Sequence, residues 1–149
     1  MGESLEHFVV DQAQYEAMLA HILACLPNEA CGLLGGQVHG SDRIAQLVIP
    51  VENVLHSPVR FRMDPLKQLE AFQYIESQNM ELVGIFHSHP TGPDAPSQTD
   101  LAEFYYPGVA VLIWSPGGDG WRVRAFRIDG DEAQANRSAS LIPVQVGKP

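Results

Sequence analysis

Apolar residues at helical spacing predict two amphipathic helices. The first begins after Asp11, which opens a capping-box pattern, and ends before Pro27. Its apolar stripe comprises Tyr15, Met18, Leu19, Ile22 and Leu23. The second begins with Asp64 as N-cap and Pro65 in the first turn. Its stripe comprises Leu66, Leu69, Phe72 and Ile75. We expect both stripes to face the core.

Shorter apolar or alternating runs predict strands. They cover residues 7–10, 28–36, 43–51, 82–86, 109–114 and 121–128, with a final short strand at 141–146. Turn residues between the second and third runs favour a hairpin. A short third helix is expected at 98–106. Because helices and strands interleave but include a hairpin, we predict an α/β (α+β) fold with a mixed sheet and helices on both sides.

The length and composition suit one domain. The 149 residues are 45% hydrophobic, which is enough for a core of their own. We predict a single domain over 1–149, with its core in about 8–128. The remaining residues, 129–149, are interpreted as a polar tract and tail.

The charge and cysteine content exclude some classes of protein. A net charge of −9 leaves no basic cluster to neutralise phosphates, so we expect no nucleic-acid partner. Two cysteines, Cys25 and Cys31, are too few for a disulfide framework. No run approaches the ~20 apolar residues of a membrane span, and no signal-peptide pattern stands at the start. We therefore predict a cytoplasmic protein without membrane contact.

One stretch, residues 81–100, carries the candidate chemistry. His87 and His89 follow an apolar run, and in a strand these alternate residues point to the same face. A loop rich in proline and glycine then leads to Asp100, which can fold back as a third ligand. Two histidines and one carboxylate, with a position open for water, form the ligand set of a catalytic zinc site. Ser97 and Asp100 also fit an ordinary helix capping box.

The combination resembles a known signature. The order H-S-H-P, six residues, Ser97, two residues and Asp100 is similar to the zinc-peptidase motif of the JAMM (MPN-plus, Mov34/JAB) metalloproteases. The upstream glutamate of that motif matches Glu29. Asn53 and the block 61–65 match compact prokaryotic members, and the resemblance extends over about 8–128.

The resemblance implies a fold, a cofactor and a reaction. The fold is the MPN/JAMM fold, whose layout is related to cytidine deaminases. One Zn²⁺ per chain is expected on His87, His89 and Asp100, with Glu29 as the general base and Ser97 as the side chain that stabilises the oxyanion. The implied activity is hydrolysis of a peptide or isopeptide bond at the C-terminal tail of a ubiquitin-like, sulfur-carrier-type protein.

Several nearby residues have competing interpretations. Ser88 points away from the two histidines and is expected to be structural. Cys31 is expected to be a small buried residue, although a thiolate is able to bind zinc. His21 is interpreted as structural or surface-exposed. Three glycines, Gly32, Gly35 and Gly36, either admit a substrate tail or allow tight packing.

Other functions stay open at this point. The main alternative is a non-catalytic MPN module that binds ubiquitin-like partners. A zinc deaminase would need H-x-E and P-C-x-x-C, which the sequence lacks. Whether the chain forms a homodimer is not decided by the sequence.

Overall fold

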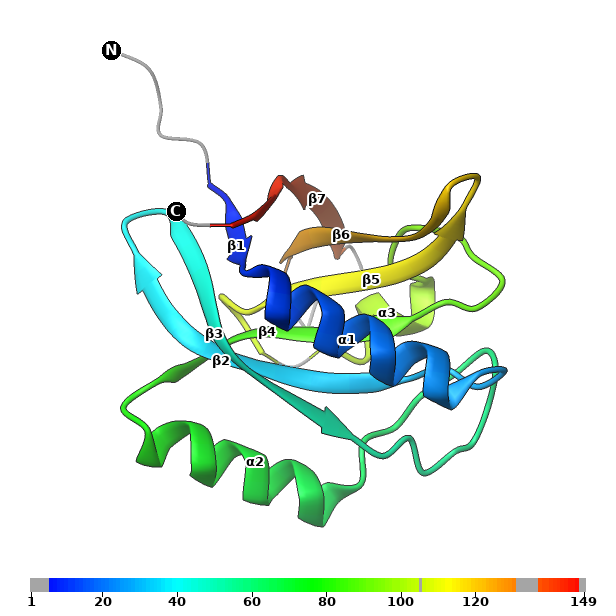
Figure 1. The fold of residues 1–149 in the computed structure, drawn as a ribbon, viewed down its shortest axis with the longest axis horizontal. Helices are drawn as coiled ribbons and strands as arrows, with labels where there is room; N and C mark the ends of the chain where they lie inside the picture. Colours follow the sequence, from blue (N-terminus) through cyan, green and yellow to red (C-terminus); the bar gives the residue numbers. More distant parts are fainter. Residues whose placement is uncertain (1–5, 105, 131–136, 148–149) are drawn as a thin grey trace.

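The computed structural model describes residues 6–104, 106–130 and 137–147. Eight strands form one mixed sheet in the order β7-β6-β5-β4-β2-β3-β1-β8, with three helices around it (Figure 1). In chain order the elements are β1 (Phe8–Val10), α1 (Gln12–Cys25), β2 (Cys31–His39), β3 (Asp42–Val51), α2 (Pro65–Ser77), β4 (Glu81–Ser88), α3 (Gln98–Ala102), β5 (Ala110–Gly117), β6 (Gly120–Asp129), β7 (Ser138–Ile142) and β8 (Val144–Val146).

Strand β4 lies in the middle of the sheet. It pairs antiparallel with β2 and parallel with β5, and β2 forms the predicted hairpin with β3. His87 therefore lies between Cys31 on β2 and Ile113 on β5. A strand paired on both sides leaves little freedom to the side chains that it presents.

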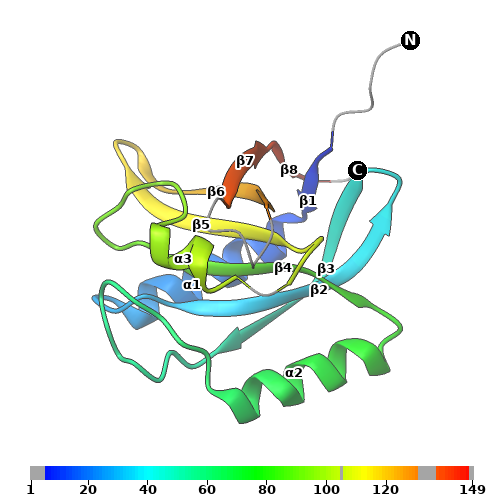
Figure 2. The same cartoon turned by 180° about the vertical axis from the view of Figure 1, so that it is seen from behind.

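The helices cover opposite faces of the sheet, as the sequence predicts. Alternate strand residues divide between two clusters: Leu34 and Phe86 pack with α1, whereas Leu33 and Ile85 pack with α2. Helix α3 lies on the same side as α2, and Figure 2 shows both of them in front of the sheet with α1 behind. Within the described residues, no helix has the length and apolar character needed to cross a membrane.

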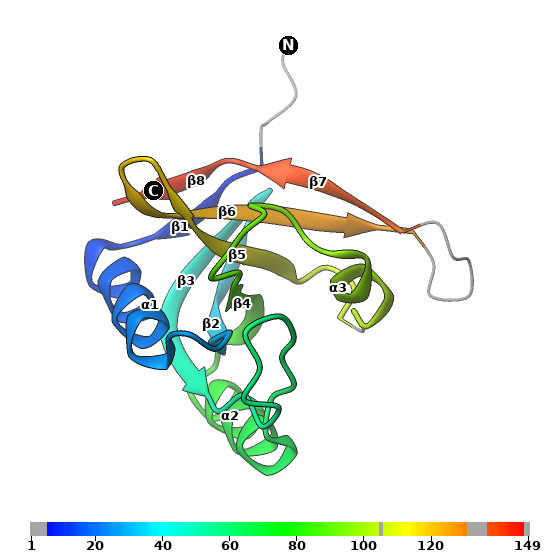
Figure 3. The same ribbon diagram turned by 90° about the vertical axis from the view of Figure 1, so that its right-hand side faces the viewer.

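The sheet curls so that its two outermost strands follow one another in the chain. β7 ends at Ile142 and β8 begins at Val144, and the N–H of Phe8 donates to the carbonyl of Pro143 at 2.9 Å (Figure 3). Two strands thus replace the single one predicted at 141–146. Ile142 is 1% exposed and packs in the main core cluster, so the core extends into the segment 129–149 that the sequence had left outside it.

Both helical stripes were predicted too widely. Leu23 is 47% exposed, and Leu66 and Leu69 at the start of α2 are 62% and 51% exposed. In α2 the buried side chains are Ala71 and Ile75, and Phe72 packs half-buried against the same cluster, because this part of the helix lies over the sheet. The third helix ends at Ala102 instead of continuing to residue 106.

The three glycines of β2 serve close packing. A Cβ on Gly32 would lie 2.4 Å from the ring of Phe86, and one on Gly36 would lie 1.9 Å from the carbonyl oxygen of Ile44. A Cβ on Gly35 would meet Ile75 of α2 at 3.0 Å. Their missing side chains face buried neighbours, so these glycines do not form an open slot for a substrate tail.

Candidate metal centre

The end of β4 brings the two predicted histidines together. His87 and His89 are 1% and 6% exposed, and their Nε2 atoms lie 3.2 Å apart. The backbone N–H of His89 donates to the carbonyl of Trp114 at 2.8 Å, which extends the pairing with β5 past the end of the strand. The same-face geometry inferred from the sequence is present.

Asp100 completes the group from α3. Its Oδ2 lies 3.1 Å from both His87 Nε2 and His89 Nε2, so the three atoms form a nearly equilateral triangle. Ligands about 2.0–2.2 Å from a tetrahedral zinc ion lie about 3.3–3.6 Å from one another. A zinc ion therefore fits these three atoms with a shift of a few tenths of an ångström.

Surrounding contacts fix the rings. His89 Nδ1 donates to the carbonyl of Pro93 at 2.7 Å, which orients the ring so that Nε2 faces Asp100. The ring of Phe61 stacks on His87 with centroids 4.4 Å apart. His87 Nδ1 is buried without a hydrogen-bond partner among the described residues.

Glu29 lies beside this triangle, ahead of β2 rather than within it. Its N–H donates to the Ser57 carbonyl at 2.8 Å, and its carbonyl accepts from Asn53 Nδ2 at 3.0 Å. One carboxylate oxygen lies within 4.8 Å of ring nitrogens of His87 and His89. The Oε1 atom is buried and has no partner among the described residues. Two carboxylates thus stand beside the histidines: Asp100, whose Oδ2 is 3.1 Å from both Nε2 atoms, and Glu29, whose oxygen lies within 4.8 Å of ring nitrogens of both.

Burial and the neighbouring groups shift the acid–base properties of the site. Burial raises the pKa of Glu29 to about 7, with His89 opposing the shift and Asp100 adding to it. Burial lowers the pKa of His87, against its hydrogen bond to Asp100. For His89, burial lowers the pKa, but hydrogen bonds to Asp100 and the Pro93 carbonyl raise it overall. A carboxyl with a pKa near 7 can both accept and release a proton at neutral pH.

Asp100 has the opposite behaviour. Burial acts to raise its pKa, but hydrogen bonds from the two histidines and from the N–H of Ser97 hold that pKa well below its usual range. It therefore stays ionised, as a metal-binding carboxylate must be. The two carboxyl groups of the site therefore differ in pKa: Asp100 is ionised at neutral pH, whereas Glu29 titrates near neutrality.

The predicted serines have distinct positions. Ser97 caps α3: its Oγ accepts from the N–H of Asp100 at 3.0 Å, which leaves its own O–H able to donate. Ser88 points to the other face, where its Oγ accepts from the N–H of Ala30 at 2.8 Å. Ser88 thus holds the chain next to Glu29, in agreement with its predicted structural role.

Cys31 and His21 have structural contacts. Cys31 is fully buried, and its thiol donates to the Val51 carbonyl at 3.4 Å. Burial raises the pKa of this thiol to about 12, which disfavours a thiolate ligand. His21 Nε2 lies 3.1 Å from the Cys31 carbonyl, so His21 is structural, as predicted.

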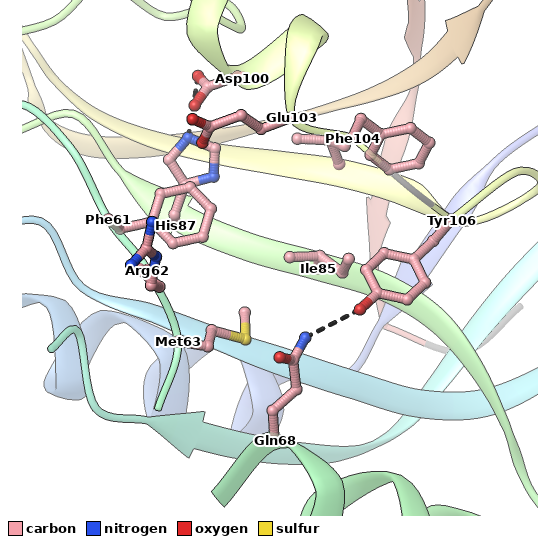
Figure 4. A pocket seen from close by; sticks show the side chains of 11 residues that line it. Phe61, Arg62, Met63, Gln68, Ile85, His87, Asp100, Glu103, Phe104 and Tyr106 are labelled. Atoms are coloured by element: carbon pink, nitrogen blue, oxygen red, sulfur yellow. Dashed lines mark hydrogen bonds and ion pairs between the residues drawn. The ribbon is translucent and has the colours of Figure 1, made fainter. Parts of the chain in front are cut away.

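A cleft of about 310 Å³ opens beside the triangle. It is lined by Phe61, Arg62, Met63, Gln68, Ile85, His87, Asp100, Glu103, Phe104, Tyr106 and Val111. Figure 4 shows His87 and Phe61 at one end, with Asp100 beyond them. At the other end Gln68 Nε2 donates to the Tyr106 hydroxyl at 3.1 Å. His87 and Asp100 are therefore accessible from this cleft.

Two contributors to the site were not assigned a role from the sequence. Phe61 and Asn53 were noted only as matching residues, yet Phe61 stacks on His87 and Asn53 fixes the backbone of Glu29. Asn53 Oδ1 also accepts from the N–H groups of Leu55 and Arg62 at 3.1 and 3.0 Å. Both effects depend on contacts between distant segments, which no local pattern reveals.

Comparisons with known proteins agree with this arrangement. Residues 11–129 match the family of prokaryotic homologs of the JAB domain. A desampylase from Haloferax volcanii is 37% identical over 107 residues, which cover 71% of this chain and 73% of the relative. A probable TtuB-protein conjugate cleaving protease from Thermus thermophilus is 37% identical over 118 residues, with coverages of 78% and 73%.

Further matches extend the similarity. A CysO-cysteine peptidase from Mycobacterium tuberculosis is 40% identical over 113 residues, which cover 75% of this chain and 76% of the relative. The solution structure of a protein from Desulfitobacterium hafniense superposes with a TM-score of 0.82 at 34% identity, and the match covers 95% of this chain and 94% of that one.

Proposed function

The chain belongs to the prokaryotic JAB family of JAMM-type hydrolases, and we propose that it is a zinc-dependent metallopeptidase. In this proposal it cleaves a peptide or isopeptide bond at the C-terminal tail of a ubiquitin-like, sulfur-carrier-type protein. The observation that carries the proposal is the triangle of His87 Nε2, His89 Nε2 and Asp100 Oδ2, with sides of 3.1–3.2 Å, beside the unpartnered carboxylate oxygen of Glu29.

His87, His89 and Asp100 would hold one zinc ion per chain. When bound, zinc supplies Lewis-acid chemistry that activates water and polarises a scissile carbonyl. Three protein ligands with one open position are the arrangement of a catalytic zinc site rather than a structural one. The pairing of β4 with β2 and β5 holds His87 before any metal binds, and the N–H of His89 is held by the Trp114 carbonyl.

Glu29 and Ser97 would move protons and stabilise charge. The Glu29 carboxylate takes a proton from the attacking water and returns it to the leaving amine, a role that suits a carboxyl with a pKa of about 7. The Ser97 hydroxyl donates to the oxygen on which negative charge develops, while its Oγ continues to cap α3. Asn53 and Ser88 keep the backbone around Glu29 in place.

The substrate class follows from the relatives and the cleft. The relatives are named for desampylation, for cleavage of TtuB-protein conjugates and for a CysO-cysteine substrate. An extended tail that enters the cleft reaches His87 and Asp100 directly. The glycines of β2 do not form part of this path, because they pack against Phe86, Ile75 and the backbone of β3.

The test uses a ubiquitin-like sulfur carrier with one residue added after its terminal Gly-Gly. Intact-mass measurement should show loss of that residue with zinc-loaded enzyme and no loss after chelation. The matched control substrate has the penultimate glycine changed to valine and should be cut much more slowly, because a side chain there obstructs a narrow path. Equal cleavage of both substrates, or ready cleavage of unrelated unfolded proteins instead, would favour a general peptidase.

A matched variant separates catalysis from binding. Glu29→Gln should lower turnover by about 10²–10⁴-fold while zinc content stays at one per chain, because the amide cannot transfer the proton. Near-normal turnover would reduce Glu29 to a structural role. Binding of the ubiquitin-like protein without cleavage by the zinc-loaded wild type would instead support the alternative, a non-catalytic MPN module.

A further inference from the structure

Ala95 and Phe104 anchor the segment that carries Asp100, because both pack against the cluster of Val111, Ile113 and Phe126, but the helix between them is exposed or half-buried. Helix α3 has five residues, and none of them is buried. Two ion pairs connect this segment to its surroundings, Arg124–Asp94 and Arg60–Glu103, each at 3.2 Å. The side chains in both pairs are 42–57% exposed. Exposed ion pairs of this kind contribute little to holding a backbone in place.

Arg137 makes a different kind of contact. Its Nη1 lies 2.7 Å from the carbonyl oxygen of Leu101 and 3.5 Å from that of Ala102, and it also donates to the carbonyl of Phe104. Leu101 and Ala102 form the last turn of α3, where carbonyls have no further helical N–H to accept from. A guanidinium at this end satisfies those carbonyls and complements the negative end of the helix dipole.

The position of this cap bears directly on the candidate metal centre. Asp100 immediately precedes Leu101, so the last turn of α3 determines where the Asp100 carboxylate lies. At the other end, Ser97 caps the helix, and its N–H also donates to Asp100 Oδ2 at 2.8 Å. The side chain of Asp100 is thus held from the N-terminal end by Ser97, while the C-terminal end depends on a residue just ahead of β7.

We propose that Arg137 is a positioning residue for the zinc centre. Its guanidinium closes the C-terminal end of α3 and so keeps Asp100 Oδ2 3.1 Å from the ring nitrogens of His87 and His89. This inference rests on the proposed zinc chemistry. It assigns a role to a residue outside the segment 11–129 that matches the family, and it connects the C-terminal strand pair to the metal centre.

The experiment measures zinc affinity by competition with a chromophoric chelator. Arg137→Gln should weaken zinc binding about 10-fold or more, the range seen when a residue that supports a ligand is lost. Arg137→Lys keeps a charge and three N–H groups on one nitrogen, so it should weaken binding only about threefold. The matched control, Arg127→Gln, removes an arginine that pairs with Glu6 and Asp129 and should leave zinc affinity unchanged.

Thermal melting of the metal-free proteins distinguishes positioning from general stabilisation. A merely structural role would lower the melting temperature of the metal-free Arg137→Gln protein and leave its zinc dissociation constant unchanged, which would overturn the inference. If Arg137→Gln does not fold, Arg137→Lys decides: threefold weaker zinc binding supports the inference and unchanged binding overturns it. Absence of zinc binding by the wild type would overturn the proposed function together with this inference.

Discussion

The two parts of the molecule that form the candidate metal centre are built in different ways. β4 and the residue that follows its end carry His87 and His89 in the middle of the sheet, where both are nearly inaccessible to solvent. The segment 90–104 delivers Ser97 and Asp100, and none of its residues is fully buried. The first part is held by the core and by ladder hydrogen bonds. The second is held by caps, by polar contacts and by the partly buried side chains of Ala95 and Phe104.

Because of this difference, substitutions in the two parts should affect folding and metal binding to different extents. A change in β4 disturbs the core and the ligands together, because the same backbone serves both. A change in 90–104 removes little buried apolar surface and therefore acts mainly on the geometry of Asp100 and Ser97. The predictions that follow test this separation, from the largest expected effect to the smallest.

The largest effect is expected from loss of His89, the proposed ligand just after β4. His89→Ala should abolish both zinc binding and cleavage, because two ligand atoms do not retain a catalytic zinc ion that needs three. Elemental analysis should give roughly one zinc per wild-type chain and none in the variant. The control His39→Ala changes an exposed histidine at the end of β2 and should retain both properties. Zinc retained by His89→Ala would show that the ion binds elsewhere.

A smaller loss is expected on the exposed side of the site. Ser97→Ala should lower turnover about 10²–10³-fold through loss of the oxyanion donor. Loss of the cap should cost about 0.5–2 kcal/mol of stability. Ser97→Thr keeps the hydroxyl and should retain most activity. If turnover at saturating zinc were normal in Ser97→Ala, the serine would act only as a cap for α3.

Loss of Asn53, which holds the backbone of Glu29, should lower both stability and turnover. Asn53→Ala removes a buried amide that donates to the Glu29 carbonyl and to the Arg60 carbonyl, each at 3.0 Å. Unfolding free energy should fall by about 1–3 kcal/mol, because buried backbone groups lose their partners. Turnover should fall about 10-fold as Glu29 loses its fixed position. Denaturant unfolding and single-turnover kinetics measure the two effects, and lost stability with unchanged turnover would contradict the positioning role.

The smallest effect concerns pH and the metal-free protein. Burial raises the pKa of Glu29 from 4.5 to about 7, so between these values the folded state binds more protons than the unfolded state. The contribution of Glu29 to stability therefore decreases as pH rises from about 4.5 to about 7. Glu29→Gln lacks this titration, so the variant should gain stability relative to wild type across that window. A difference that does not change with pH would show that Glu29 is not desolvated.

The sequence indicates the chemistry better than it indicates the supports. The i, i+2 spacing of His87 and His89 and the caps at Asp11, Asp64 and Ser97 are local patterns, and the structure confirms them. Exposure of Leu66 and Leu69 was not predictable, because helical spacing does not reveal which turns extend beyond the sheet. The exposure of these helix turns depends on where α2 begins relative to the edge of the sheet.

Long-range contacts account for the remaining differences. The role of the β2 glycines depends on Phe86 and Ile75, which lie far away in the chain. Likewise, Arg137 meets the Leu101 carbonyl across 36 residues, and no motif connects the two. Such contacts follow from tertiary packing and have no signature in local spacing.

The central claim is that zinc is held by His87, His89 and Asp100, with Glu29 beside it as a base. An X-ray structure of the zinc-loaded protein with anomalous scattering at the zinc edge tests this directly. We predict one zinc ion about 2.0–2.2 Å from His87 Nε2, His89 Nε2 and Asp100 Oδ2, and Glu29 outside bonding distance. Zinc bound by Glu29 in place of Asp100, or by Cys25 or Cys31, would contradict the account.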